Sequence, residues 1–440
     1  MRAMWTQAGM IAAGTPDSRN RAIDFLRAIS LCVVTLGHWL IAAPYMSEGQ
    51  ASFGHLLTEV EWTRYLTWLL QVMPIFFFVG GWSNATTWVA ARNSSVPFAA
   101  WLHMRVRRLL VPVLVLLIFW VGVAVVATFS GLHPAALEIA SQTALLPVWF
   151  LAIYLLVVAL VPLTYSAWRR WGMATIWLPI ALASFVDVLF FGTSWTLFGW
   201  SNYLFVWGAV HQLGYAWKDK RLSTAKLQAL CAGGGGLALI VLLKLIDGPW
   251  PISLVGVPGE VVSNTTPPHI PLLALAAFQF GIIRLCEAPL NRWLAKPFPW
   301  TATVMLGASA MTLYLWHSTS MMFLIGGAFW AGGIGLTWET GTLAWWGSRL
   351  LWIPSFFVMF LPFLAIFGKF ERPAPAGVLP PSVFRQVLGL LFICGGLAFL
   401  ARGGVTGTGF LGVPGLHLSL AFVGIWMATA TDGPFSGNSR

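Results

Sequence analysis

Long apolar segments separated by short polar ones dominate the chain from residue 22 onward. A helix that crosses a bilayer needs about 20 mostly apolar residues. The twelve segments that meet this requirement lie at 22–43, 65–90, 109–129, 147–166, 174–191, 197–216, 226–246, 269–286, 301–324, 347–368, 384–401 and 410–430. The pattern predicts an all-α polytopic membrane protein.

Basic side chains fall in clusters that alternate from one connecting segment to the next. If the amino terminus is cytoplasmic, 21 of the 25 Lys and Arg side chains lie on the cytoplasmic side. Those expected on the opposite side are Arg64, Lys244, Arg349 and Arg402. Cytoplasmic segments of membrane proteins are enriched in Lys and Arg, so the charge map predicts twelve spans with both termini in the cytoplasm.

A proline-rich stretch after the tenth span marks a boundary, because proline cannot continue a helix. The predicted organisation is a cytoplasmic tail at 1–21, a ten-helix core at 22–372, a linker at 373–383, a carboxy-terminal pair of transmembrane helices at 384–430 and a cytoplasmic tail at 431–440. We find no convincing internal repeat, which argues against transporters built from two related halves.

Composition narrows the class further. The chain is 58% hydrophobic and only 9% charged, whereas soluble domains carry about 25% charged residues. The net charge of +11 is spread between the spans, while nucleic-acid binders gather their cations on one face, so no nucleic-acid partner is expected. The four cysteines lack the spacing of metal ligands, and no metal site is predicted.

The first span carries the sharpest candidate chemistry. Arg27 and His38 are eleven residues apart, about three helical turns, so they share one helix face at a separation of about 16 Å. Ionisable groups inside a span are functional hypotheses by default. The alternatives are a basic anchor that reaches the membrane surface and a histidine that only packs.

Two further motifs carry polar groups. Arg105 and Arg108 lie three residues apart before the third span, and two guanidinium groups on one helix face can bind phosphate; a basic flank of a span is the simpler interpretation. His317 in the ninth span is expected at a depth similar to that of His38, where it could share a polar cavity or serve only structure. Weaker candidates inside spans, expected to face the bundle, are Asn84, Asp187 and His211.

Together these features resemble the acyltransferase-3 family of integral membrane acyltransferases over about 22–370. The matching stretches are Arg21 to Arg27 with Gly37-His38, Pro74 to Gly81, Arg105-x-x-Arg108 with Pro112, Trp149-Phe150-Leu151, and Tyr314-x-x-His317. In one departure, Gly80-Gly81 stands where the family pattern has a Ser-Gly pair.

The resemblance implies transfer of an acyl group, often acetyl, from an acyl-coenzyme A to a hydroxyl of an envelope sugar or glycolipid in a bacterial inner membrane. It assigns Arg27, Arg105 and Arg108 to the phosphates of the donor. His38 would be the general base, with His317 as a second polar group in the site. An intermediate with the acyl group on a side chain remains open.

Two other classes of function remain. A secondary transporter would suit twelve spans and a few intramembrane ionisable groups, but it has no reason to bind an acyl-coenzyme A. A noncatalytic membrane scaffold would leave the alignment of Arg27 and His38 on one helix face unexplained.

Overall fold

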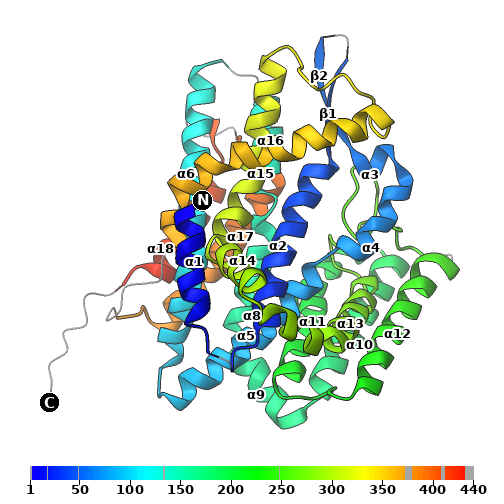
Figure 1. The fold of residues 1–440 in the computed structure, drawn as a ribbon, viewed down its shortest axis with the longest axis vertical. Coiled ribbons are helices and arrows are strands. Elements are labelled where there is room, and N and C mark those ends of the chain that lie inside the picture. Colours follow the sequence, from blue (N-terminus) through cyan, green and yellow to red (C-terminus); the bar gives the residue numbers. More distant parts are fainter. Residues whose placement is uncertain are drawn as a thin grey trace.

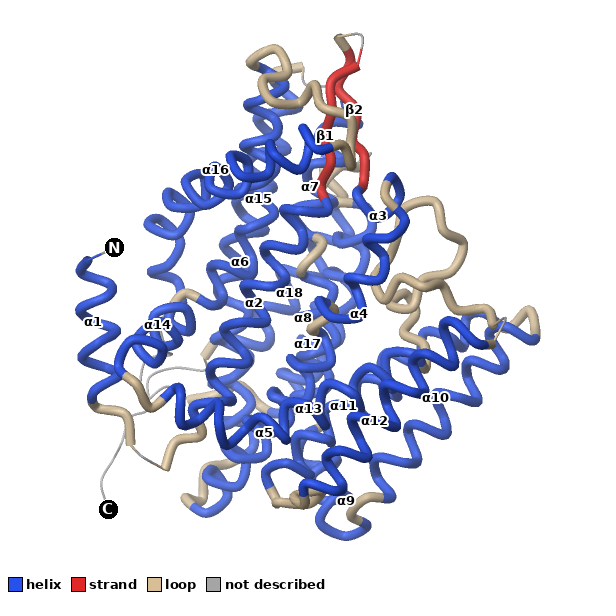
Figure 2. The backbone as a smooth tube through the Cα atoms, turned by 45° about the vertical axis from the view of Figure 1, so that its right-hand side comes forward, coloured by secondary structure: helices blue, strands red, loops and turns tan. Residues whose placement is uncertain are grey.

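A computed structural model describes residues 2–431, except for 17, 48, 132–133, 247, 372–378 and 408–411. The described elements are helices and one small antiparallel sheet (Figures 1 and 2). Much of the predicted linker and the predicted carboxy-terminal tail lie outside the described residues. The predicted amino-terminal tail contains a helix, α1, whose Trp5 contacts Phe298 on α14.

The first half of the described chain contains α1 (Arg2–Ala13), α2 (Arg21–Ile41), β1 (Ala42–Ser47), β2 (Gln50–His55), α3 (Leu56–Glu59), η1 (Glu61–Leu66), α4 (Thr67–Leu70), α5 (Met73–Asn93), α6 (Phe98–Phe129), α7 (Pro134–Leu145), α8 (Val148–Ala159), α9 (Val161–Trp171) and α10 (Ala174–Gly192).

The second half contains η2 (Thr196–Ser201), α11 (Asn202–Lys218), α12 (Ala225–Ile240), η3 (Val241–Leu245), α13 (Pro271–Leu294), α14 (Pro297–Ala308), α15 (Ala310–Trp330), α16 (Leu343–Phe367), η4 (Gly368–Glu371), α17 (Val383–Gly403) and α18 (Gly415–Thr429).

Nine helical segments in the described part of the chain are long and apolar enough to cross a membrane. They correspond to nine of the predicted spans and confirm an all-α polytopic membrane protein. The remaining three predicted spans fall on α11, on α14 with α15, and on α18. Helices α11 and α18 are shorter, with 17 and 15 residues. The predicted ninth span is interrupted at Ser309, between α14 and α15.

Glycines bring several helix pairs into close contact. A Cβ atom at Gly81 of α5 would fall within 3.0 Å of the His211 carbonyl oxygen on α11. A Cβ at Gly281 of α13 would meet the backbone of α12, and one at Gly424 of α18 would meet the backbone of α17 at Gly389. Small residues at helix interfaces allow backbones to approach in membranes, where no hydrophobic force between helices drives association.

Helix α2 lies in the middle of the bundle and contacts α5, α13, α14, α15 and α16. It ends at the β1–β2 hairpin, which projects from one end of the molecule (Figure 2). We call this the hairpin end. This central position places Arg27 of α2 against α5 and His38 against α15.

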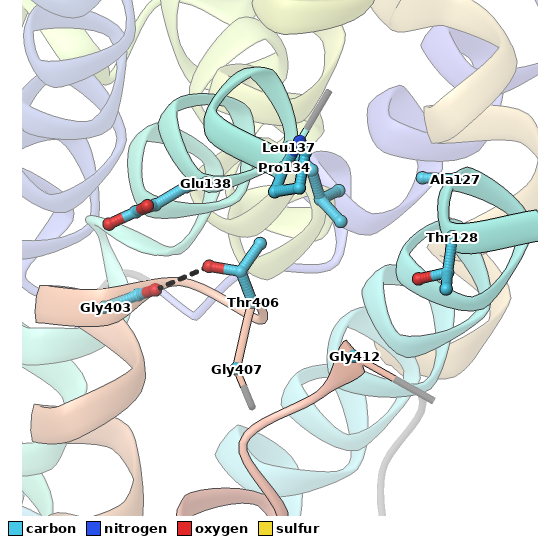
Figure 3. Close-up of a pocket in the computed structure, with 9 residues that line it drawn as sticks. All are labelled: Ala127, Thr128, Pro134, Leu137, Glu138, Gly403, Thr406, Gly407 and Gly412. Atoms are coloured by element: carbon cyan, nitrogen blue, oxygen red, sulfur yellow. Dashed lines mark hydrogen bonds between the residues drawn. The ribbon is translucent and has the colours of Figure 1, made fainter. Parts of the chain in front are cut away.

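The carboxy-terminal helices α17 and α18 pack on the core. The Cys394 thiol of α17 donates to the Ala152 carbonyl on α8, and the backbone N–H of Val405 donates to Ser141 on α7. A cavity of about 590 Å³ lies where the ends of α6, α7 and α17 meet (Figure 3). The pair is therefore an integral part of the bundle.

Candidate active site

Two histidines predicted from separate spans meet inside the bundle. Nδ1 of His38 on α2 lies 2.8 Å from Nε2 of His317 on α15, and their rings stack with centroids 5.1 Å apart. His317 is fully buried, whereas His38 is half-buried. The structure therefore joins these two residues directly and leaves His38 as the more accessible member.

The surroundings of His317 decide which ring donates in this pair. Nδ1 of His317 lies 3.0 Å from the Leu313 carbonyl oxygen. A carbonyl only accepts, so Nδ1 of His317 carries a proton, and Nε2 of the neutral ring is an acceptor. Nδ1 of His38 must then donate to it. This tautomer leaves a lone pair on Nε2 of His38, the form that a general base requires.

Helix α15 is held firmly around His317. The indole N–H of Trp39 donates to the His317 carbonyl at 3.1 Å, and that of Trp120 donates to the Thr319 hydroxyl at 3.1 Å. The Tyr314 hydroxyl donates to the carbonyl of Pro147, just before α8. These bonds link α15 to three other parts of the chain and restrict the orientation of the His317 ring.

The first turn of α15 is capped by Glu371, the last residue of η4. The Glu371 carboxylate accepts the backbone N–H groups of Met311 at 2.7 Å and Thr312 at 3.2 Å, and also the Thr312 hydroxyl. The first N–H groups of a helix have no partner within the helix, and a carboxylate there also interacts favourably with the helix dipole. Glu371 therefore stabilises the helix that carries His317.

Arg27 and Arg105 come together on Ser83 of α5. Nη2 of Arg27 donates to the Ser83 hydroxyl at 3.4 Å, and Nη2 of Arg105 donates to the Ser83 carbonyl at 3.4 Å. Arg105 also donates to Oδ1 of Asn84 at 2.6 Å and to the Thr87 hydroxyl. One turn of α5 therefore brings together Arg27 of α2 and Arg105 of α6, which were predicted to lie on separate helix faces.

The third predicted arginine, Arg108, is exposed on α6. It interacts electrostatically with Arg105, as does Arg27. Arg27 retains Asp24 as an ion-pair partner at 3.4 Å, and its side chain is 43% exposed. Arg108 also interacts electrostatically with the carboxylate of Glu371. The cluster of Arg27, Arg105 and Arg108 is thus partly accessible, and its three positive charges face two carboxylates, those of Asp24 and Glu371.

A buried network supports Arg105 from behind. Nδ2 of Asn84 lies 3.1 Å from Nε2 of His211 and 3.4 Å from the Tyr154 hydroxyl. A Cβ at Gly80 would meet the Tyr154 ring at 2.8 Å, whereas Gly81 contacts the backbone of α11. This explains the departure from the family pattern at residue 80, where the Tyr154 ring occupies the space of a side chain.

Asp187 of α10 belongs to a different cluster. Its carboxylate accepts from the side chains of Asn202, Trp250 and His269 and from the backbone N–H of Ile270, at 2.7 to 3.2 Å. It fastens the segment between η3 and α13 to α10. Asp187 faces the bundle, as we expected. Its contacts stabilise the fold at a place separate from the histidine pair and the arginine cluster.

His55 and Arg349 are two polar residues that sequence reasoning did not select as site residues. His55 ends β2, where no local pattern distinguishes it; burial, followed by the charge of nearby His38, lowers its pKa to about 4. Arg349 lies inside α16, and its position within a span was a signal that the charge map treated only as topology.

In the described part of the chain, no group of three His, Cys, Asp or Glu side chains is arranged to hold a metal ion.

The family comparison agrees with this arrangement. A family model described as an acyltransferase domain matches residues 20–368, which include the histidine pair, the arginine cluster and Arg349, and which end before α17. No curated protein and no solved structure matches the chain. Because the matched region spans far more than half of its 440 residues and contains every motif discussed above, the chain belongs to the acyltransferase-3 family.

Proposed function

We propose that the protein transfers an acyl group, with acetyl as the expected one, from an acyl-coenzyme A to a hydroxyl group of an envelope sugar or glycolipid. The observation that carries this proposal is the 2.8 Å contact between His38 and His317. In the tautomer that follows from this contact, Nε2 of His38 is unprotonated. The residue is half-buried inside a bundle whose family is that of membrane acyltransferases.

In this proposal the arginine cluster binds the donor. Guanidinium groups form strong, paired hydrogen bonds to phosphate oxygens, and coenzyme A carries several phosphates. Arg27 and His38 lie on the same uninterrupted helix, α2, about 16 Å apart. The extended pantetheine arm would follow α2 from the cluster toward the histidine pair and place the thioester beside His38.

The reaction then needs two proton transfers, one from the acceptor hydroxyl to His38 and one from His38 to the leaving thiolate. Nε2 of His38 takes the proton from the acceptor hydroxyl while its oxygen attacks the thioester carbonyl carbon. The new C–O bond forms and the C–S bond breaks. The leaving thiolate recovers the proton from His38, which yields the acyl ester and free coenzyme A. His317 is a positioning residue here, because it fixes the tautomer of His38 without touching the reacting atoms.

The charge map supports a multi-pass orientation with both termini in the cytoplasm, and the family resemblance suggests that the membrane is a bacterial inner membrane. Under this orientation the arginine cluster faces the cytoplasm, where coenzyme A is made, and the hairpin end faces outward. An acceptor in the envelope would then approach His38 from the hairpin end.

The test is acetyl-coenzyme A binding and thiol release by protein purified in detergent. We expect His38→Ala to abolish thiol release while it retains donor binding, and Arg105→Gln to weaken donor binding at least tenfold. His417→Ala and Arg402→Gln are matched controls, since both residues lie on helices outside the family match. Undiminished release by His38→Ala would refute the mechanism, and a wild-type protein that neither binds nor turns over the donor would favour a transporter.

A further inference from the structure

Arg349 is a buried cation in a part of the bundle where such a charge is costly. It lies in α16 and only 6% of its surface is exposed. Charged side chains inside membrane spans are expensive and usually pair with an opposite charge or with backbone carbonyls. Among the residues that the structure describes, no carboxylate lies within ion-pairing distance of Arg349. Within that part of the chain, the charge of Arg349 is left without a counter-ion.

The hydrogen bonds of Arg349 are also few and long. Nη1 donates to the Ala42 carbonyl at 3.5 Å and Nη2 to the Ser348 hydroxyl at 3.3 Å, while Nε has no partner in the described chain. The guanidinium group lies over the rings of Trp345 at 4.2 Å and Trp352 at 5.7 Å. Aromatic faces hold a cation in place, but they do not use the donors of a guanidinium group, which has five N–H bonds.

Arg349 is adjacent to the end of the helix that carries His38. The N–H of Ala42 donates to the His38 carbonyl at the end of α2, and the Ala42 carbonyl accepts from Arg349. In the hairpin, Ala42 is paired directly with His55. His38, His55 and Arg349 therefore all lie next to Ala42. Arg349 is hydrogen-bonded to the carbonyl of Ala42, which follows His38 by one helical turn.

His55 and Trp345 add two more unused nitrogens at this junction. Nδ1 of His55 and Nε1 of Trp345 are buried, and neither has a hydrogen-bond partner in the described part of the chain. Trp345 contacts Ala43 and Leu56 on either side of the hairpin. Buried polar atoms are normally satisfied. These two nitrogens and Nε of Arg349, none of which has a partner in the described chain, therefore indicate that a ligand rich in oxygen completes the group.

From this arrangement we infer that Arg349, with His55 and Trp345, forms a subsite for an oxyanion, a carboxylate or phosphate carried by the acyl acceptor. This inference rests on the proposed function and specifies its substrate class: an acceptor with a negative charge close to the hydroxyl that is acylated. The anion would neutralise Arg349 and accept from the free N–H groups, which would place the neighbouring hydroxyl near His38.

The test measures binding separately from turnover. The melting temperature of the full chain in detergent is followed during titration with hexyl glucuronide, with the uncharged hexyl glucoside, and with inorganic phosphate. Charge-assisted hydrogen bonds are about twice as strong as neutral ones, and we expect the glucuronide to bind about tenfold more tightly than the glucoside. Stabilisation by inorganic phosphate supports the subsite only if Arg349→Gln removes it, because the arginine cluster is also expected to bind phosphate.

Four variants make the result specific. Arg349→Gln should remove the preference for the glucuronide, Arg349→Lys should retain part of it, and His55→Asn should reduce it. Arg402→Gln is the matched control and should keep the full preference. If Arg349→Gln does not fold, Arg349→Lys and His55→Asn decide the question.

The inference is overturned if the wild type shows no preference for an anion, or if the Arg349 and His55 variants keep the full preference. Thiol release distinguishes this failure from that of the proposed function. Release of thiol without anion preference would overturn only the subsite, whereas anion preference without donor binding would overturn the acyltransferase mechanism and leave the subsite standing.

Discussion

Gly81→Ala tests whether the contact between α5 and α11 holds the donor site together. The added Cβ atom would fall within 3.0 Å of the His211 carbonyl oxygen, a separation that real Cβ atoms essentially never show. The neighbouring atom is helix backbone, which cannot rotate away as a side chain could. The two helices must therefore separate locally.

The expected cost has two parts. Overpacking a close contact costs typically 1–3 kcal/mol, and separating the helices stretches the 3.1 Å bond between Asn84 and His211, worth about 1 kcal/mol. We therefore expect Gly81→Ala to lower the free energy of unfolding by about 2–4 kcal/mol. Because Asn84 lies one turn after Gly81 and holds Arg105 at 2.6 Å, acetyl-coenzyme A should also bind more weakly.

The assay compares Gly81→Ala with Gly122→Ala. A Cβ at Gly122 of α6 would have no atom within 4 Å, and alanine is a better helix former than glycine by about 0.5–1 kcal/mol. Unfolding in mixed micelles should show the first variant destabilised and the second unchanged or slightly stabilised, and calorimetry should show weaker donor binding only for the first. Equal stability of the two variants would refute the close contact, and wild-type donor affinity in Gly81→Ala would refute its link to Arg105.

Three further predictions follow from the polar networks. Glu371→Ala removes the cap of α15 and should lower the free energy of unfolding by about 1–2 kcal/mol, with slower thiol release; wild-type values in micelle unfolding and in kinetics would contradict this. Asn84→Leu leaves Arg105 without its 2.6 Å partner and should weaken acetyl-coenzyme A binding about tenfold. An unchanged affinity in calorimetry would show that Asn84 does not position Arg105 for the donor. Asp187→Asn weakens four hydrogen bonds to a buried carboxylate and should expose the segment before α13 to proteolysis. A wild-type digestion pattern would show that Asp187 does not hold this segment against α10.

The helices and the general location of the polar residues were predictable because they depend on local composition. A span is recognisable from about 20 apolar residues, and nine such helices are found in the described chain. The break at Ser309 was not predicted, since hydropathy does not distinguish one long helix from two consecutive ones. The helix α1 within the predicted tail was missed because it is too short and polar for a span.

The site was only partly predictable, because contacts between spans have no period in the sequence. His38 and His317 were selected separately as polar residues at a similar depth, but their 2.8 Å contact and the tautomer that follows from it depend on how α2 and α15 pack. Similarly, Arg27 and Arg105 were both expected to face the donor. That they meet on Ser83 follows from the crossing of α2, α5 and α6.

Arg349 shows how a topology signal can conceal a functional one. Only four basic residues fall on the side opposite the cytoplasm in the predicted map. The charge rule describes an excess of Lys and Arg on the cytoplasmic side, so a few residues on the other side do not contradict it. That rule concerns charges near the ends of spans, in contact with water, whereas Arg349 is buried against α2 and the hairpin. A basic residue on the disfavoured side that is also buried is explained by neither topology nor solvation. In a membrane protein, this combination is a reason to look for the anion that it would bind.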